Sequence, residues 1–145
     1  MRFVFQFLVF IFISFSLTLK SQEIWDADNE NGTYTNPILY SYYSDPDVVK
    51  VGDMYYMTAS SFNSIPGLPI LESSDLVNWK LINYARKRNV PEEVYREVQH
   101  GKGVWAPCNR FYKGEFYIFY PDPDFGILFD KNKNSRRPLV GTDSH

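Results

Sequence analysis

The chain has 145 residues, of which 18% are aromatic, and a formal net charge of −2 at pH 7. This length suits about one small domain. Nucleic acid and anionic membranes are recognised by clustered lysine and arginine, so the mildly acidic composition argues against both partners. The chain has two histidines and one cysteine, Cys108, which we interpret as a small buried apolar residue. These counts exclude an intramolecular disulfide, and we expect neither a metal nor a cofactor.

The N-terminus has the order of a secretion signal. Arg2 gives a positive start, residues 3–19 form a largely apolar run, and Ser21 is a small residue at a plausible cleavage site. The run is short for a membrane span, and an uncleaved anchor is the alternative interpretation. We therefore predict a signal peptide over residues 1–21, export to the periplasm or the extracellular space, and no membrane attachment after cleavage.

An Asp-Pro-Asp corner follows a polar stretch, residues 22–35, that we expect to be an exposed leader. Pro46 fixes its own φ and directs Asp45 toward an extended conformation, so the Asp45 carboxylate should be held in one place. On the residues alone, two interpretations stay open. Asp45 is either a catalytic carboxylate or a turn aspartate that hydrogen-bonds nearby backbone.

Four short strands are predicted after the corner, and their aromatic and β-branched residues favour an all-β fold class. The strands are expected at residues 47–51, 54–60, 68–73 and 76–82. Gly52 and Asp53 have the composition of a tight hairpin turn between the first two. Such a set fits either one blade of a β-propeller or one sheet of a β-sandwich.

A short helix and a second group of strands follow. The helix is predicted over residues 91–99, because a proline stands at its start, acidic residues fill its first turn and a glycine follows its end. Strands are predicted at residues 104–107, 109–112 and 116–120, with a turn at residues 113–115.

The hairpin of residues 51–56 recurs at residues 113–118, a shift of 62 positions that aligns glycine with glycine and Tyr55 with Tyr117. This spacing suits large propeller blades. Apolar periodicity is lost from residue 130 onward, and we predict a polar, irregular tail over residues 130–145.

Several motifs stand in a fixed order along the chain. They are Asn36-Pro37-Ile38-Leu39, Ser44-Asp45-Pro46-Asp47, Ser60-Ser61-Phe62, Ser74-Asp75-Leu76-Val77-Asn78-Trp79 and Gly103-Val104-Trp105-Ala106-Pro107. In this order they resemble the start of the catalytic domain of glycoside hydrolase family 43, and the resemblance spans residues 36–127. It implies a five-bladed β-propeller, of which residues 36–129 would form about the first two blades, so the chain would be truncated.

The resemblance also implies a function. Members of this family hydrolyse β-xylosides or α-L-arabinofuranosides with inversion in the breakdown of hemicellulose, so a xylo- or arabino-oligosaccharide would be the partner. The family's general base falls on Asp45, and its sugar-lining aromatic residues fall on Phe62 and Trp105. Inversion needs one carboxylate to take a proton from water and a second carboxyl group to protonate the leaving oxygen. The family takes that general acid from later blades, and none is expected in this chain.

Three hypotheses follow from the resemblance. The chain is an incomplete copy of an inverting glycosidase with little or no turnover by itself, a non-catalytic carbohydrate-binding remnant that uses Phe62 and Trp105, or an inactive and unstable fragment. The resemblance assigns no acid role to a second Asp-Pro-Asp run, Asp122-Pro123-Asp124. The predicted tail departs from the family's pattern, which suggests a truncated or frame-shifted gene product.

Overall fold

The computed structural model describes residues 25–132. The predicted signal peptide and residues 133–145 of the predicted tail lie outside the described residues. No helix between residues 25 and 132 has the length and apolar character needed to cross a membrane.

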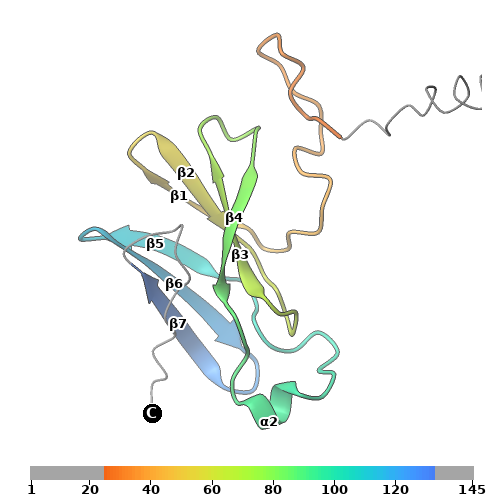
Figure 1. Cartoon of the computed structure of the whole chain (residues 1–145), viewed down its shortest axis with the longest axis vertical. Coiled ribbons are helices and arrows are strands. Elements are labelled where there is room, and N and C mark those ends of the chain that lie inside the picture. The colour runs from red at the N-terminus through yellow and green to blue at the C-terminus, as the bar shows by residue number, and fades with distance from the viewer. Residues whose placement is uncertain (1–24, 133–145) are drawn as a thin grey trace, which may run out of the picture.

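The described chain is built around two antiparallel sheets (Figure 1). The first sheet contains, in order, β1 (Asp47–Val51), β2 (Met54–Thr58), β3 (Gly67–Ser73) and β4 (Lys80–Arg86). The second contains β5 (Cys108–Tyr112), β6 (Glu115–Asp122) and β7 (Gly126–Asn132). One short helix, α2 (Glu92–Tyr95), lies in the segment that joins the sheets. The predicted all-β fold class is confirmed.

Tight hairpins join β1 to β2 and β5 to β6, as the sequence predicts. The first closes where Val51 pairs with Met54, and Gly52 has a φ of +62°. The second closes where Tyr112 pairs with Glu115, so its turn contains residues 113 and 114, both with positive φ. Gly52 is the first residue of its turn, as in type II′, and Gly114 is the second residue of its turn, as in type I′. Both turn types match the twist of the strands in a hairpin. The repeat of the sequence is therefore offset by one residue at the turns.

The fourth strand begins later than predicted, at Lys80 instead of residue 76. The Asp75 carboxylate explains the difference, because its Oδ1 accepts hydrogen bonds from the backbone N–H groups of Val77 and Asn78 at 2.9 and 2.7 Å. These bonds fold residues 75–78 into a turn and leave no extended backbone for a ladder. The side-chain amide of Asn78, followed by these backbone donors, holds the pKa of Asp75 well below its usual value.

Three further predictions differ from the structure. The helix has a single turn rather than residues 91–99. In the predicted strand at residues 104–107 only Val104 pairs, in an isolated bridge with Phe62. Strand β7 runs to Asn132, so residues 130–132 belong to the sheet rather than to an irregular tail. Asp130 is only 3% exposed, and the guanidinium of Arg86 lies 3.6 Å from it.

A core of apolar side chains holds the two sheets together. Its members come from β3, β4, β6 and the segment before β5, and they are Leu68, Ile70, Ala85, Val104, Ile118 and Tyr120. Fully burying one large side chain of this kind stabilises a fold by about 1.5–3 kcal/mol. Asp47 forms one of the polar links between the sheets, because its Oδ2 accepts hydrogen bonds from the Asn109 N–H at 2.6 Å and from Arg110 at 2.9 Å.

Residues 25–35, the described part of the predicted leader, are largely exposed and are attached to the connection between β3 and β4. Asp28 and Tyr34 form a bridge, and the Asn78 side chain donates a hydrogen bond to Asp28 at 2.9 Å. Residues 25–43 and the outer face of the sheet enclose an open groove of about 490 Å³, lined in part by Trp25 and Trp79. We call it the N-terminal groove; Asp45, Phe62 and Trp105 do not line it.

Candidate active site

Asp45 lies at the edge of the first sheet, just before β1. Its Oδ2 accepts hydrogen bonds from the hydroxyls of Ser44 and Ser60, both at 2.9 Å. The backbone N–H of Ser60 also donates to the Ser44 carbonyl at 2.9 Å, which ties the two serines together. Within residues 25–132 no hydrogen bond engages Oδ1, and the residue is exposed. The carboxylate is therefore fixed through one oxygen and open to water through the other.

The backbone at Asp45 is left-handed, with a φ of +48°, instead of extended as the following proline predicts. Aspartate is one of the few residues besides glycine that adopt this region with some frequency. A residue held there stores about 1–3 kcal/mol of strain and depends on its surroundings to stay in place. Here the serine contacts supply that support, so the side chain is positioned by neighbours rather than by the proline alone.

Phe62 lies in the loop between β2 and β3, where it meets the segment before β5. Its backbone N–H donates to the Val104 carbonyl at 2.9 Å, and the Val104 N–H donates back to the Phe62 carbonyl at 3.0 Å. Gly103 makes this approach possible, because a Cβ there would lie 2.5 Å from the Phe62 carbonyl oxygen. Two loops from different sheets thus touch through their backbones.

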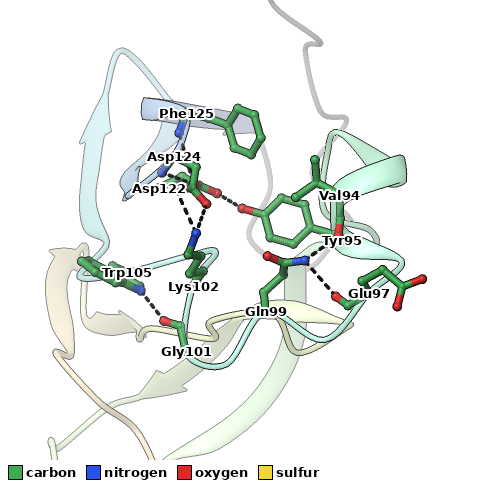
Figure 2. Close-up of polar contacts among 10 residues, drawn as sticks. All are labelled: Val94, Tyr95, Glu97, Gln99, Gly101, Lys102, Trp105, Asp122, Asp124 and Phe125. Atoms are coloured by element: carbon green, nitrogen blue, oxygen red, sulfur yellow. Dashed lines mark hydrogen bonds and ion pairs between the residues drawn. The ribbon is translucent and has the colours of Figure 1, made fainter.

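Trp105 follows Val104, and two hydrogen bonds fix it. Its backbone N–H donates to the Pro121 carbonyl at 3.0 Å, and its indole Nε1–H donates to the Gly101 carbonyl at 2.7 Å (Figure 2). The side chain stays 40% exposed. A fixed and accessible indole face offers the kind of surface on which the C–H groups of a sugar pack.

A short path of contacts connects the three predicted site residues. Asp45 bonds to Ser60, Ser60 stands two positions before Phe62, and Phe62 pairs with the residue preceding Trp105. By contrast, Asp53 lies in the turn at the opposite end of β1. Strand β1 itself carries Asp47, whose carboxylate is used between the sheets.

Sequence reasoning gave no individual role to Tyr42 and Ser60. The Tyr42 ring centroid lies 6.4 Å from that of Phe62, and the side chain is 78% exposed. Ser60 lies in the Ser60-Ser61-Phe62 motif, and Tyr42 stands two positions before the motif that begins at Ser44. Their contacts depend on how the loop after β2 folds back on the corner, which no local pattern specifies.

The second Asp-Pro-Asp corner is occupied by other contacts (Figure 2). Asp122 is 4% exposed and accepts a hydrogen bond from the Tyr95 hydroxyl. Asp124 pairs with the Lys102 ammonium at 2.9 Å. Burial, followed by the hydrogen bond to Asp122, raises the pKa of Tyr95. In the part of the chain that the structure describes, no group of three or more histidine, cysteine, aspartate or glutamate side chains is arranged to hold a metal ion.

Residues 34–140 match the family described as glycosyl hydrolases family 43. The chain belongs to this family. The match continues past residue 129, so the expectation that the tail departs from the family's pattern is wrong.

Named relatives agree with this membership. The chain is 35% identical over 115 residues to a β-xylosidase of Formosa agariphila, covering 77% of this chain and 19% of the relative. It is 38% identical over 86 residues to the non-reducing end α-L-arabinofuranosidase of Bacteroides ovatus, covering 59% and 16%. A solved bifunctional GH43-CE structure from Bacteroides eggerthii superposes with a TM-score of 0.64 at 37% identity, covering 73% of this chain and 14% of that one. The chain spans about a fifth of the length of the first curated relatives that it matches.

Proposed function

We propose that the chain supplies the general-base side of the active site of an inverting glycosidase that acts on β-xylosides or α-L-arabinofuranosides. Family membership and the names of the relatives support this substrate class. The observation that carries the proposal is the exposed Asp45 carboxylate, which two serine hydroxyls fix through one oxygen and which a short path of contacts connects to Phe62 and Trp105.

The chemistry assigned to Asp45 is proton transfer from water. Its Oδ1 takes a proton from a water molecule while the water oxygen attacks the anomeric carbon of the sugar. A carboxyl group on the opposite face, about 6.5–9.5 Å away in enzymes of this class, gives its proton to the leaving oxygen. We assign that general acid to no residue of this chain. Phe62 and Trp105 would pack against the sugar ring and orient it for attack.

The proposed architecture is a five-bladed β-propeller in which the two sheets are the first two blades. The similarity to solved family 43 structures and the face-to-face packing of the sheets support it. Without the general acid, the chain alone should show little or no turnover, because that group typically contributes a factor of about 10² to 10⁴. We also propose that residues 1–21 direct the protein out of the cytoplasm, as their composition suggests.

A chimera tests the proposal. Residues 34–132 replace the matching segment of the F. agariphila β-xylosidase, and rates are measured with an aryl β-D-xyloside and an aryl α-L-arabinofuranoside. We expect an active chimera that loses about 10² to 10⁴ in rate on Asp45→Asn. Asp53→Asn, at the other end of β1, is the matched control. An Asp45→Asn chimera with an unchanged rate would show that Asp45 is not the base.

A non-catalytic carbohydrate-binding role is the second candidate. The exposed Trp105 ring, fixed by two hydrogen bonds, favours it. It predicts binding of xylo-oligosaccharides by the chain in a calorimetric titration, together with an inactive chimera. Heat changes no larger than those of dilution would remove this candidate.

A further inference from the structure

We propose that the turn between β6 and β7 adds a second sugar-binding wall beside Trp105. The wall consists of Lys102, Asp124 and Phe125, and we call it the turn wall. This inference rests on the proposed function, because it assigns the same oligosaccharide a further set of contacts.

The position of the turn within the fold gives the first argument. In the first sheet, the loop between the second and third strands carries Phe62. The turn at residues 123–125 is the connection between the second and third strands of the second sheet. Carried past residue 118, the shift of 62 aligns position 124 with Phe62, and the one-residue offset at the hairpin turns keeps the aligned position within residues 123–125. Both connections emerge at the end where β1 and β5 begin.

Contacts join this turn to the segment that carries Trp105. Trp105 donates its backbone N–H to Pro121, at the end of β6, and its indole N–H to Gly101. The next residue, Lys102, reaches Asp124 Oδ2 at 2.9 Å and Oδ1 at 3.2 Å. In Figure 2 the Lys102 side chain points at Asp124, in the same segment that carries Trp105. Lys102 and Trp105 therefore lie on one short segment that contacts both β6 and the turn.

Hydrogen bonds to the buried Asp122 carboxylate hold the turn in one conformation. Asp122 Oδ1 accepts hydrogen bonds from the backbone N–H groups of Asp124 at 3.0 Å and Phe125 at 3.3 Å, while its Oδ2 accepts one from the Tyr95 hydroxyl. The Tyr95 and Phe125 rings lie 6.1 Å apart. Such support fixes the exposed groups before a ligand arrives, which lowers the entropy lost on binding.

The exposed groups have the chemistry that a sugar needs. The Lys102 and Asp124 side chains are 51% and 39% exposed, and Phe125 is 40% exposed. Sugar hydroxyls both donate and accept hydrogen bonds, so an adjacent ammonium and carboxylate can each bind one through charge-assisted bonds. An exposed ion pair contributes only about 0–1 kcal/mol to stability. Stabilisation of the fold is therefore a weak explanation for the Lys102–Asp124 pair, and ligand binding is a stronger one.

Three tryptophan indoles provide a local readout in the full chain. Each donates to a different backbone carbonyl: Trp25 to Pro37, Trp79 to Leu76 and Trp105 to Gly101. Xylotriose is titrated into ¹⁵N-labelled chain, and the indole N–H resonances are followed. We expect a saturable shift of the Trp105 resonance alone. Lys102→Ala and Asp124→Ala should each weaken this binding about tenfold, the equivalent of one charged hydrogen bond.

The second sheet contains a matched control pair. Lys131 and Glu115 form an ion pair at 2.8 Å near the opposite end of the sheet. Lys131→Ala and Glu115→Ala should leave the titration unchanged. Unchanged positions of the Trp25 and Trp79 resonances show that each variant is folded like the parent.

Three results would overturn the turn wall. Unaltered affinity in both wall variants, with binding lost in Trp105→Ala, would reject the wall and leave the proposed function standing. Shifts of the Trp25 and Trp79 resonances would place the sugar in the N-terminal groove instead. Absence of any saturable shift in the parent chain would also reject the wall, whereas the rate of the Asp45→Asn chimera would decide the general base independently.

Discussion

The two Asp-Pro-Asp corners have the same three residues and opposite arrangements. In the first corner the leading aspartate, Asp45, is exposed and the trailing one, Asp47, joins the two sheets. In the second corner the leading aspartate, Asp122, is buried under a turn, and the trailing one, Asp124, is exposed. The first corner leads into a strand, whereas the second ends one strand and begins a hairpin turn.

This comparison shows that topology, rather than local sequence, decides which carboxylate is available. A residue that ends a central strand faces the core when it continues the inward alternation of that strand, as Asp122 does after Ile118 and Tyr120. A residue placed before an edge strand has no such constraint. Asp45 is therefore free to face solvent, and the predictions below test how far the roles of the two corners differ.

The largest difference should appear in catalysis. In the chimera, Asp45→Asn should lower kcat by about 10² to 10⁴, while Asp124→Asn should lower it by tenfold or less, roughly the loss of one hydrogen bond. Rates at saturating aryl xyloside measure both. Equal losses of rate in the two variants would contradict the assignment of the general base to Asp45 and of sugar binding to Asp124.

Stability should respond in the opposite order. Asp122→Ala leaves the Tyr95 hydroxyl and the Asp124 N–H without their acceptor, while the Phe125 N–H keeps the backbone carbonyl of residue 122. We expect the free energy of unfolding to fall by about 2–3 kcal/mol. Asp45→Asn should change it by about 1 kcal/mol or less, because the side chain is exposed and asparagine tolerates the left-handed backbone. Urea denaturation of the full chain compares them. A larger loss in the Asp45 variant would contradict the assignment of Asp122 as the structural member.

The trailing residues should differ by a smaller amount. Asp47→Ala removes hydrogen bonds to Asn109 and Arg110 across the sheets, and we expect a loss of about 1–2 kcal/mol. Asp124→Ala removes only an exposed ion pair and should cost about 0–1 kcal/mol. The same urea midpoints report this difference, and Asp53→Ala serves as a surface control.

The smallest effect should be the alkaline pH dependence. The pKa of Tyr95 is raised in the folded chain, so the folded state keeps its proton longer than the unfolded state. The resulting stabilisation is complete below the unfolded tyrosine pKa of about 10 and is lost as the pH rises above it. Tyr95→Phe should therefore flatten the fall of melting temperature above pH 10. Parallel curves for variant and parent would show that Tyr95 does not titrate in this way.

The sequence predicted those parts of the fold that depend on neighbouring residues alone. The turns at Gly52 and Gly114 and the strands that flank them follow from turn residues and aromatic strands. The fourth strand could not be located as well, because the Asp75 turn competes for the same backbone. No strand is predicted from the sequence at residues 126–132, where the structure has β7. Asp130 in this strand is charged, and only the fold brings Arg86 beside it.

For the candidate site, the sequence indicated which residues to consider but not the contacts that hold them in place. The motifs indicated Asp45, Phe62 and Trp105, whose roles remain predictions. The left-handed backbone at Asp45 and the hydroxyl of Ser60 on its carboxylate come from a contact across 15 residues of chain. Contacts of that separation depend on strand register, and a single sequence does not reveal them.

The absence of a side chain at Gly103 sets how closely the Phe62 loop approaches the segment that carries Trp105. A methyl group at this position would lie 2.5 Å from the Phe62 carbonyl oxygen, on a backbone whose φ of +99° already disfavours a side chain. Gly103→Ala would therefore push the Phe62 loop away from Trp105 while leaving both rings intact. A loss of sugar affinity in that variant would show that Phe62 and Trp105 bind the sugar together at a fixed separation. An unchanged affinity would show that each ring binds independently.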